Sequence, residues 1–533
     1  VAGALSVVVV ENKTSAYTGG AVILLSKGDI TVLSSANATL VLSTLYGTGG
    51  GAAGVGGSAA VAVFAGATKA YLGNGTTADA GGILSVRADS VENVITTAVG
   101  GSGGGAAGVA GSLTVKVIST TTQAYIGAGA LINQNEAFIS ELQSVLVQAE
   151  DQVVDVGLAG CGSGGGAAGV AGSVDVAIIR NMTSAFIGDN ACVNAELDID
   201  ILAASDKYVN SLVATGSGGG AAGVAGSLSI ISVGSLLDST ALSGLTGQNE
   251  DEESVGTQDE LDKQITANPV DGILGNSEQA AQVNETINAE LAGIGISDDF
   301  ANASEVALNN TQAFIGLGAQ VNAGRNLTVR ADDKTVIIVA EAAGSGGGAA
   351  GVAGAIGVIL LHDAAEAFIG AGAITNAGGI TTVEAKTSDN VFAAGVTGSG
   401  AGAAAVNGVS ITSIVKSESL AYIANGAKVN QNPLYQTTGQ SVYVLANGET
   451  YIVAVAGSGG GAGAAAVGGA ANVGVFTKTI KAFIGENALV NAQKNIIVSA
   501  ESSQMLVAVT VSIFGAGAAA VSGDVGTITL YST

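Results

Sequence analysis

Apolar and polar residues alternate with a period of two over much of the chain, a pattern typical of β-strands with one buried face. One stretch places Leu113, Val115 and Val117 on one side and Thr114 and Lys116 on the other. Because successive side chains of a strand point to opposite faces, we expect the valine and leucine side to face the core. The pattern therefore predicts an all-β protein.

A second strand pattern, apolar-x-Val-x-Ala, recurs along the chain, as at Leu84, Val86 and Ala88. It follows a segment of the form Ala-x-Val-Asn-Ala, which we expect to form a turn. Asparagine tolerates the left-handed backbone, and its amide can bond to the same residue one layer away. The asparagines of this segment are Asn133, Asn194, Asn322, Asn376, Asn430 and Asn491.

A glycine- and alanine-rich tract repeats about every 54 residues, so the chain is an array of similar units. The tract reads GSGGGAAGVAGS at 101–112, and related tracts begin near residues 47, 162, 216, 344, 398, 457 and 515. One gap measures 128 residues, which indicates about 74 extra residues in that unit. We expect eight periods and, since both ends fall at similar points of the period, a piece of a longer array.

Such a unit, with three to four short strands, cannot close a core alone, but similar units can stack and bury one another. Small side chains let two sheets approach more closely than the usual ~10 Å. We therefore predict a flattened β-solenoid of about eight 54-residue repeats at 1–232 and 307–533, with an acidic, partly helical insertion at 233–306. The sequence leaves open whether one unit forms one or two rungs.

An aromatic residue occupies one position of every unit, and we expect these rings to form a structural ladder by packing between layers. Tyrosine and phenylalanine interchange there, so the hydroxyl group is not required. An electron path or a row of sugar-stacking platforms is the alternative. The ladder residues are Tyr17, Tyr71, Tyr125, Phe186, Phe314, Phe368, Tyr422 and Phe483.

The insertion differs in character from the repeats, because residues 233–306 hold 15 acidic side chains and one basic one, Lys263. A capping box at Thr257 and Glu260 indicates a helix. The acidic run is a candidate for calcium or partner contact, but it lacks the spaced ligands of a calcium loop. We interpret the insertion as a surface decoration for lateral or partner contact. The run consists of Glu250, Asp251, Glu252 and Glu253.

Composition excludes several classes of function. The chain carries 17 basic and 43 acidic residues, a net charge of −26, which argues against a nucleic-acid partner. With 48% apolar residues and 2 prolines it is neither disordered nor collagen-like. A single histidine, His362, and two cysteines supply little for catalysis or metal binding, so we expect no enzyme, cofactor or metal. Cys161 and Cys192 fit a disulfide or two buried thiols equally well.

Three uncharged runs, at 208–237, 390–415 and 450–477, are long enough to cross a bilayer as helices. Their glycine density and the Val/Ile/Thr alternation that follows favour strands instead. No basic clusters flank the runs. We therefore expect no membrane span, with a membrane-inserting, pore-forming assembly as the alternative.

The segment AYIGAGALINQ, the apolar-x-Val-x-Ala strand and the tract GSGGGAAGVAGS together resemble the repeats of leukotoxin-type filamentous adhesins of anaerobic bacteria. More distantly they resemble filamentous-haemagglutinin-like secreted proteins. The resemblance covers nearly the whole chain except 233–306 and implies export to the cell surface, a rigid fibre and adhesion. We expect a structural, extracellular fibre or adhesin stalk whose partners are further copies of itself and a host or neighbouring cell surface. A binding module for carbohydrate or host protein is the second hypothesis.

Overall fold

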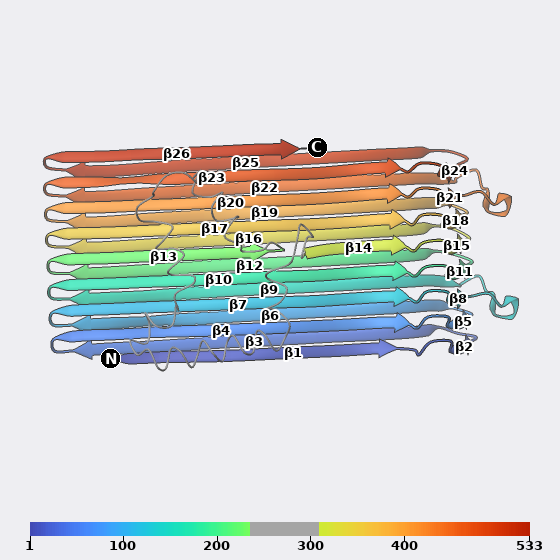
Figure 1. Ribbon diagram of the computed structural model, residues 1–533, viewed down its shortest axis with the longest axis horizontal. Helices are drawn as coiled ribbons and strands as arrows, with labels where there is room; N and C mark the ends of the chain where they lie inside the picture. Colours follow the sequence, from blue (N-terminus) through green and yellow to red (C-terminus); the bar gives the residue numbers. More distant parts are fainter. Residues whose placement is uncertain (235–308, 533) are drawn as a thin grey trace, which may run out of the picture.

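Residues 1–234 and 309–532 are described by a computed structural model, in which parallel strands stack into a β-solenoid (Figure 1). Each coil runs along one long strand, a short strand and a second long strand before the next coil begins. These three positions build three parallel sheets, which we call sheets A, B and C. The predicted fold class, a flattened all-β solenoid, is therefore confirmed.

Sheet A contains β1 (Ala2–Tyr17), β4 (Ala53–Leu72), β7 (Ala107–Ile126), β10 (Ala168–Ile187), β13 (Ala222–Val233), β14 (Asn309–Ile315), β17 (Ala350–Ile369), β20 (Ala404–Ile423), β23 (Ala465–Ile484) and β26 (Ala519–Ser532). Sheet B contains β2 (Ile23–Ser26), β5 (Thr77–Ala80), β8 (Leu131–Ile132), β11 (Cys192–Ala195), β15 (Gln320–Ala323), β18 (Ile374–Ala377), β21 (Lys428–Val429) and β24 (Leu489–Val490). Sheet C contains β3 (Ile30–Gly50), β6 (Ile83–Gly104), β9 (Ser144–Gly165), β12 (Ile199–Gly219), β16 (Leu327–Gly347), β19 (Ile380–Ala401), β22 (Ser441–Ala462) and β25 (Ile496–Ala516).

Every repeat forms one rung, because equivalent residues of neighbouring units pair directly. Tyr71 pairs with Tyr125, and Gly104 with Gly165, so sequence-equivalent positions form columns along the solenoid axis. Strands β13 and β14 share one row between β10 and β17. The expected insertion begins between these two strands, and residues 235–308 lie outside the described residues.

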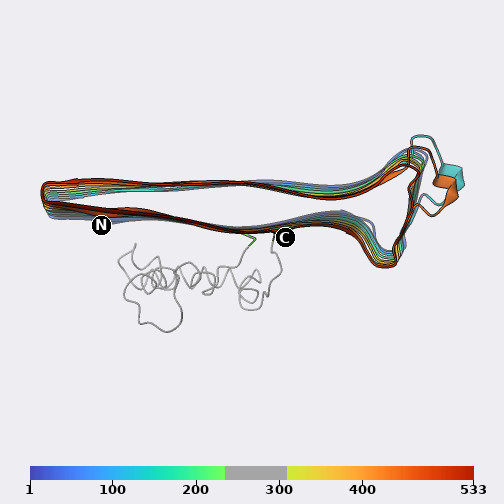
Figure 2. The same ribbon diagram turned by 90° about the horizontal axis from the view of Figure 1, so that it is seen from above.

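The coil is a flat hairpin that widens at one end, where sheet B closes a triangular section (Figure 2). At the opposite, closed end a two-residue link joins sheet C to sheet A, as between β6 and β7. Glycine is required there because the backbones of the two sheets touch. A Cβ on Gly104 would lie 1.9 Å from the carbonyl oxygen of Ala107, and one on Gly108 would lie 2.3 Å from that of Gly164.

The interior contains two apolar regions separated by a polar one. The first fills the triangular section with side chains such as Leu72, Val86 and Ile126. The second fills the flat section with side chains such as Val94 and Ile118. Because every coil contributes equivalent residues, burial depends on stacked neighbours rather than on a single unit.

Two details of the predicted strands are wrong. Each unit contains two long strands of 20 to 22 residues in most coils and one short strand, rather than three to four short ones. The Ala-x-Val-Asn-Ala segment forms the short strand of sheet B in several coils, such as β11, β15 and β18. It turns at Asn133 and Asn430, where φ is +57° and +58° and the link to sheet C is longer. Those two links contain the 3-10 helices η1 (Glu136–Phe138) and η2 (Pro433–Tyr435).

The predicted orientation of β7 is also wrong. Thr114 and Lys116 are fully buried between sheets A and C, so Leu113, Val115 and Val117 point to the opposite side of the strand, where Leu113 is 3% and Val117 9% exposed. The alternation correctly predicted a strand but not which of its faces is turned to the interior, because buried polar groups here find partners across the flat interior. The larger apolar residues of this part of β7 therefore lie on the outer side of sheet A.

Candidate functional site

The predicted aromatic residues form one continuous stack along sheet A. Centroids of neighbouring rings lie 4.7 to 5.0 Å apart, and their planes differ by at most 9°. This spacing equals the distance between neighbouring strands, so the backbone register holds the rings together. Tyr17 and Phe483 are the ends of the stack.

The ring stack runs on the outer side of sheet A, beside fully buried inward neighbours such as Ala70 and Leu72. Each inner ring has both faces covered by the rings above and below it. A sugar-stacking platform needs an open ring face, so the stack offers such faces only at its ends. The Tyr422 hydroxyl donates a 3.0 Å hydrogen bond to Glu366, which also accepts one of 2.7 Å from Gln312.

Truncating a ring inside the stack should cost more than truncating one at its end. Phe186 packs between Tyr125 and Phe314, whereas Phe483 contacts one described ring, that of Tyr422. We expect Phe186→Ala to lower the free energy of unfolding by about 2 kcal/mol and Phe483→Ala by about half of that. Urea titration of both variants measures this difference, and equal losses would contradict a cooperative stack.

The asparagines of sheet B form a second ladder. Asn322 donates its amide to the side chain of Asn194 at 2.9 Å, and Asn376 donates to Asn322 at 2.8 Å. Asn133 instead reaches the backbone carbonyl of Asn194 at 2.9 Å. The expected bond between layers therefore occurs, and it fixes the register of sheet B.

A polar column runs through the interior between the two apolar regions and has Lys207 near its centre. The Lys207 ammonium is fully buried and lies 2.7 Å from Asp333 and 3.9 Å from Asp363. It also donates to the Ser205 hydroxyl at 3.1 Å, and Thr311 donates to Asp333 at 2.8 Å. One lysine thus joins residues from three consecutive coils of the array.

The column continues toward both ends through Asp151 on one side and Asp389 and Lys478 on the other. Asp151 accepts from Thr122 at 2.7 Å and from Asn181. Burial raises the pKa of Asp151 to about 6, and that of Asp333 and of Asp363 to about 7. These carboxyl groups therefore hold protons more tightly in the fold than in the unfolded chain.

A second buried ion cluster lies nearer the closed end. Lys116 lies 3.1 Å from Asp155 and 3.0 Å from Asp175, and all three side chains are completely buried. Thr114 donates to Asp175 as well. Neither lysine cluster was predicted from the sequence, because the alternating polar residues of the strands were expected to face solvent. The only sign of these clusters in the sequence was that Asp, Asn, Thr and Lys recur at equivalent positions of neighbouring repeats.

Burial shifts the pKa of each remaining candidate for chemistry. Cys161 and Cys192 are free thiols, and burial raises the pKa of each, which disfavours the reactive thiolate. Burial lowers the pKa of His362 to about 4, so its imidazole is neutral at physiological pH. Among the described residues, no hydrogen bond joins His362 to a nucleophilic side chain.

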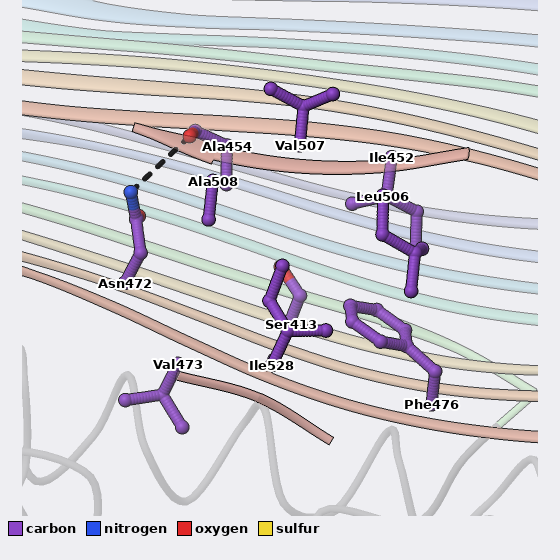
Figure 3. A pocket seen from close by; sticks show the side chains of 11 residues that line it. Ser413, Ile452, Ala454, Asn472, Val473, Phe476, Leu506, Val507, Ala508 and Ile528 are labelled. Atoms are coloured by element: carbon purple, nitrogen blue, oxygen red, sulfur yellow. Dashed lines mark hydrogen bonds between the residues drawn. The ribbon is translucent and has the colours of Figure 1, made fainter. Parts of the chain in front are cut away.

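A small pocket lies near the C-terminal end of the solenoid, between β22, β23, β25 and β26 (Figure 3). Its volume is about 10 Å³, which is at the lower limit for one water molecule. Apolar side chains such as Ile452, Phe476 and Leu506 line most of it, and the Asn472 amide is held by the Ala454 carbonyl. Its small size and apolar lining are those of a packing defect between the end coils.

Within residues 1–234 and 309–532, no three His, Cys, Asp or Glu side chains form a group able to hold a metal ion. No helix in those ranges is long and apolar enough to cross a membrane. The acidic run Glu250, Asp251, Glu252 and Glu253 lies outside the described residues. No protein-family model, curated protein or solved structure matches this chain.

Proposed function

We propose that this chain is a structural, extracellular segment of a stiff fibre or adhesin stalk, extended by adding further coils along the solenoid axis. Eight coils of in-register parallel strands extend the solenoid by roughly 38 Å along its axis at ~4.8 Å per coil. Its stability should grow with the number of coils, because each coil gains from its neighbours. Adhesion and export rest on the resemblance of the repeats alone.

The observation that carries this proposal is that each sheet ends in an edge strand at either end of the solenoid. Among the described strands, β1 pairs with β4 only, and β26 pairs with β23 only. Such edges are templates for another parallel strand. The end rings of the stack, Tyr17 in β1 and Phe483 in β23, also leave one stacking face each for a further coil.

A proline on the outer side of an edge strand should reduce axial assembly. Thr18 donates its N–H to Tyr71 in the next coil. Because N–H directions alternate along a strand, the N–H of Val9 points away from β4. We expect Val9→Pro to shorten or remove filaments in electron micrographs and light scattering, while Val9→Thr leaves them intact. Monomers only, at all concentrations of the unaltered chain, would refute the proposal.

A further inference from the structure

Charged residues are confined to one half of the outer face of sheet C. The half beside sheet B carries ion pairs between coils, such as Arg87 with Glu150 at 3.0 Å and Lys386 with Glu449 at 3.5 Å. In the half beside the closed end, which starts at the column of Val41, no outward residue of the described strands is charged. Glu341 lies in that half but points inward and is 4% exposed.

Three neighbouring columns of that half form a flat surface, which we call the apolar face. Large side chains stand out from it, and Leu45 is 71%, Val41 61% and Leu212 48% exposed. Its residues are Val41, Ile95, Val156, Asn210, Ile338, Phe392, Val453 and Val507, then Ser43, Thr97, Leu158, Leu212, Ala340, Ala394, Val455 and Val509, then Leu45, Val99, Gly160, Ala214, Ala342, Val396, Gly457 and Val511.

The size of this surface fits a protein interface. Three columns span about 20 Å along the strands and eight coils span about 38 Å along the axis, which gives roughly 760 Å². A standard stable interface uses about 800 Å² on each partner. An exposed apolar patch of this extent marks an interaction site in soluble proteins.

We propose that the apolar face binds the apolar face of a second copy of this chain, so that two solenoids pack laterally, sheet C against sheet C. A twofold axis parallel to the solenoid axis superposes the two apolar halves and carries the two charged halves to opposite sides. The charged residues of each copy then remain in water and do not face the charged residues of the other copy. This lateral contact is independent of the axial assembly proposed above.

The charge of the chain favours a second copy over a lipid surface. A net charge of −26 opposes approach to anionic membranes. The charged residues nearest to the apolar face on its sheet B side, including Asp206, Lys334 and Glu449, mix both signs and do not form a basic belt. Apolar contact between acidic molecules should strengthen with sulfate salts, which screen repulsion and favour burial of apolar surface.

Two double variants test the contact in a Val9→Pro background, where axial assembly is blocked at sheet A. Leu212→Lys with Phe392→Lys places two charges on the apolar face. Leu202→Lys with Leu445→Lys places the same charges on the outer face of the charged half of sheet C. Sedimentation equilibrium measures the dimer dissociation constant of each, and thermal unfolding shows that each variant folds.

We expect the background and the control to dimerise with equal affinity, and sodium sulfate to strengthen both dimers. The apolar-face variant should raise the dissociation constant at least about a hundredfold. Equal weakening of both variants, or a monomer in every sample, would overturn the proposal. So would a monomeric background protein that floats with phosphatidylcholine vesicles while its apolar-face variant does not.

Discussion

Lys207→Met is expected to lower the free energy of unfolding by about 3–5 kcal/mol at pH 8, because removing one partner of a buried ion pair leaves the other uncompensated. Asp333 and Asp363 both face Lys207 in the interior, and they lie in the next two coils of the array. Methionine fills a similar volume, so the loss reports charge rather than packing. Denaturant titration followed by circular dichroism measures it.

The loss should shrink at pH 5, and the direction follows from the pKa values. The pKa of Asp333 and of Asp363 is raised from 3.8 to about 7, mainly by burial. A raised carboxyl pKa contributes stability below its unfolded value, and that contribution is lost as pH rises through about 7. At pH 5 both groups are mostly protonated and need Lys207 less. The unaltered chain should also unfold more easily at pH 8 than at pH 5, and Asp151 acts in the same direction.

Two further variants separate this effect from a general loss of lysine. Lys334→Met removes an exposed lysine of the outer face of sheet C and should change stability by less than about 0.5 kcal/mol. Lys207→Met with Asp333→Asn should recover part of the loss at pH 8. A Lys207→Met loss that is the same at pH 5 and pH 8 would contradict the electrostatic account.

Gly165→Ala should lower the free energy of unfolding by about 3 kcal/mol or more, although it adds a single methyl group. Its Cβ would lie 2.0 Å from the carbonyl oxygen of Ala168, on the other side of the closed end. Relief by separating the sheets is resisted, because Gly104 and Gly219 occupy the same position in the adjacent coils. Thermal and denaturant unfolding both report the effect.

The neighbouring glycine is the matched control. A Cβ on Gly164 would find nothing within 4 Å, so Gly164→Ala should be neutral or slightly stabilising through the unfolded chain. Similar losses in the two variants would mean that the sheets do not touch at the closed end.

The sequence carries the period and the phase of this fold because stacking places equivalent residues in contact. The recurring aromatic residue and the glycine tract each contact their own copies, so both leave a periodic signal. The ring stack and the flattened section were therefore predictable. The number of rungs in a repeat was not, since two long strands of a flat coil and several short ones share the same alternation.

The interior was harder to predict, because a period of two says that a strand has two faces and not which is buried. Lys116 would be a solvent residue on its own strand, and its burial is tolerable because it pairs with Asp155 on the opposite sheet and with Asp175 on the neighbouring strand. The docking of sheet A on sheet C supplies the first partner and the stacking of coils supplies the second, and no local pattern contains either one. The apolar face of sheet C shows the same reversal, because its apolar residues point outward.

One distance tests the central claim that each repeat forms one rung. Ser35 and Glu501 lie in a single outer column of sheet C, at its first and last strands. Spin labels on Ser35→Cys and Glu501→Cys, in a Cys161→Ala and Cys192→Ser background, report their separation by pulsed electron resonance. Seven spacings of ~4.8 Å predict a narrow distribution near about 34 Å. A distribution near about 67 Å, or one without a defined maximum, would contradict the account.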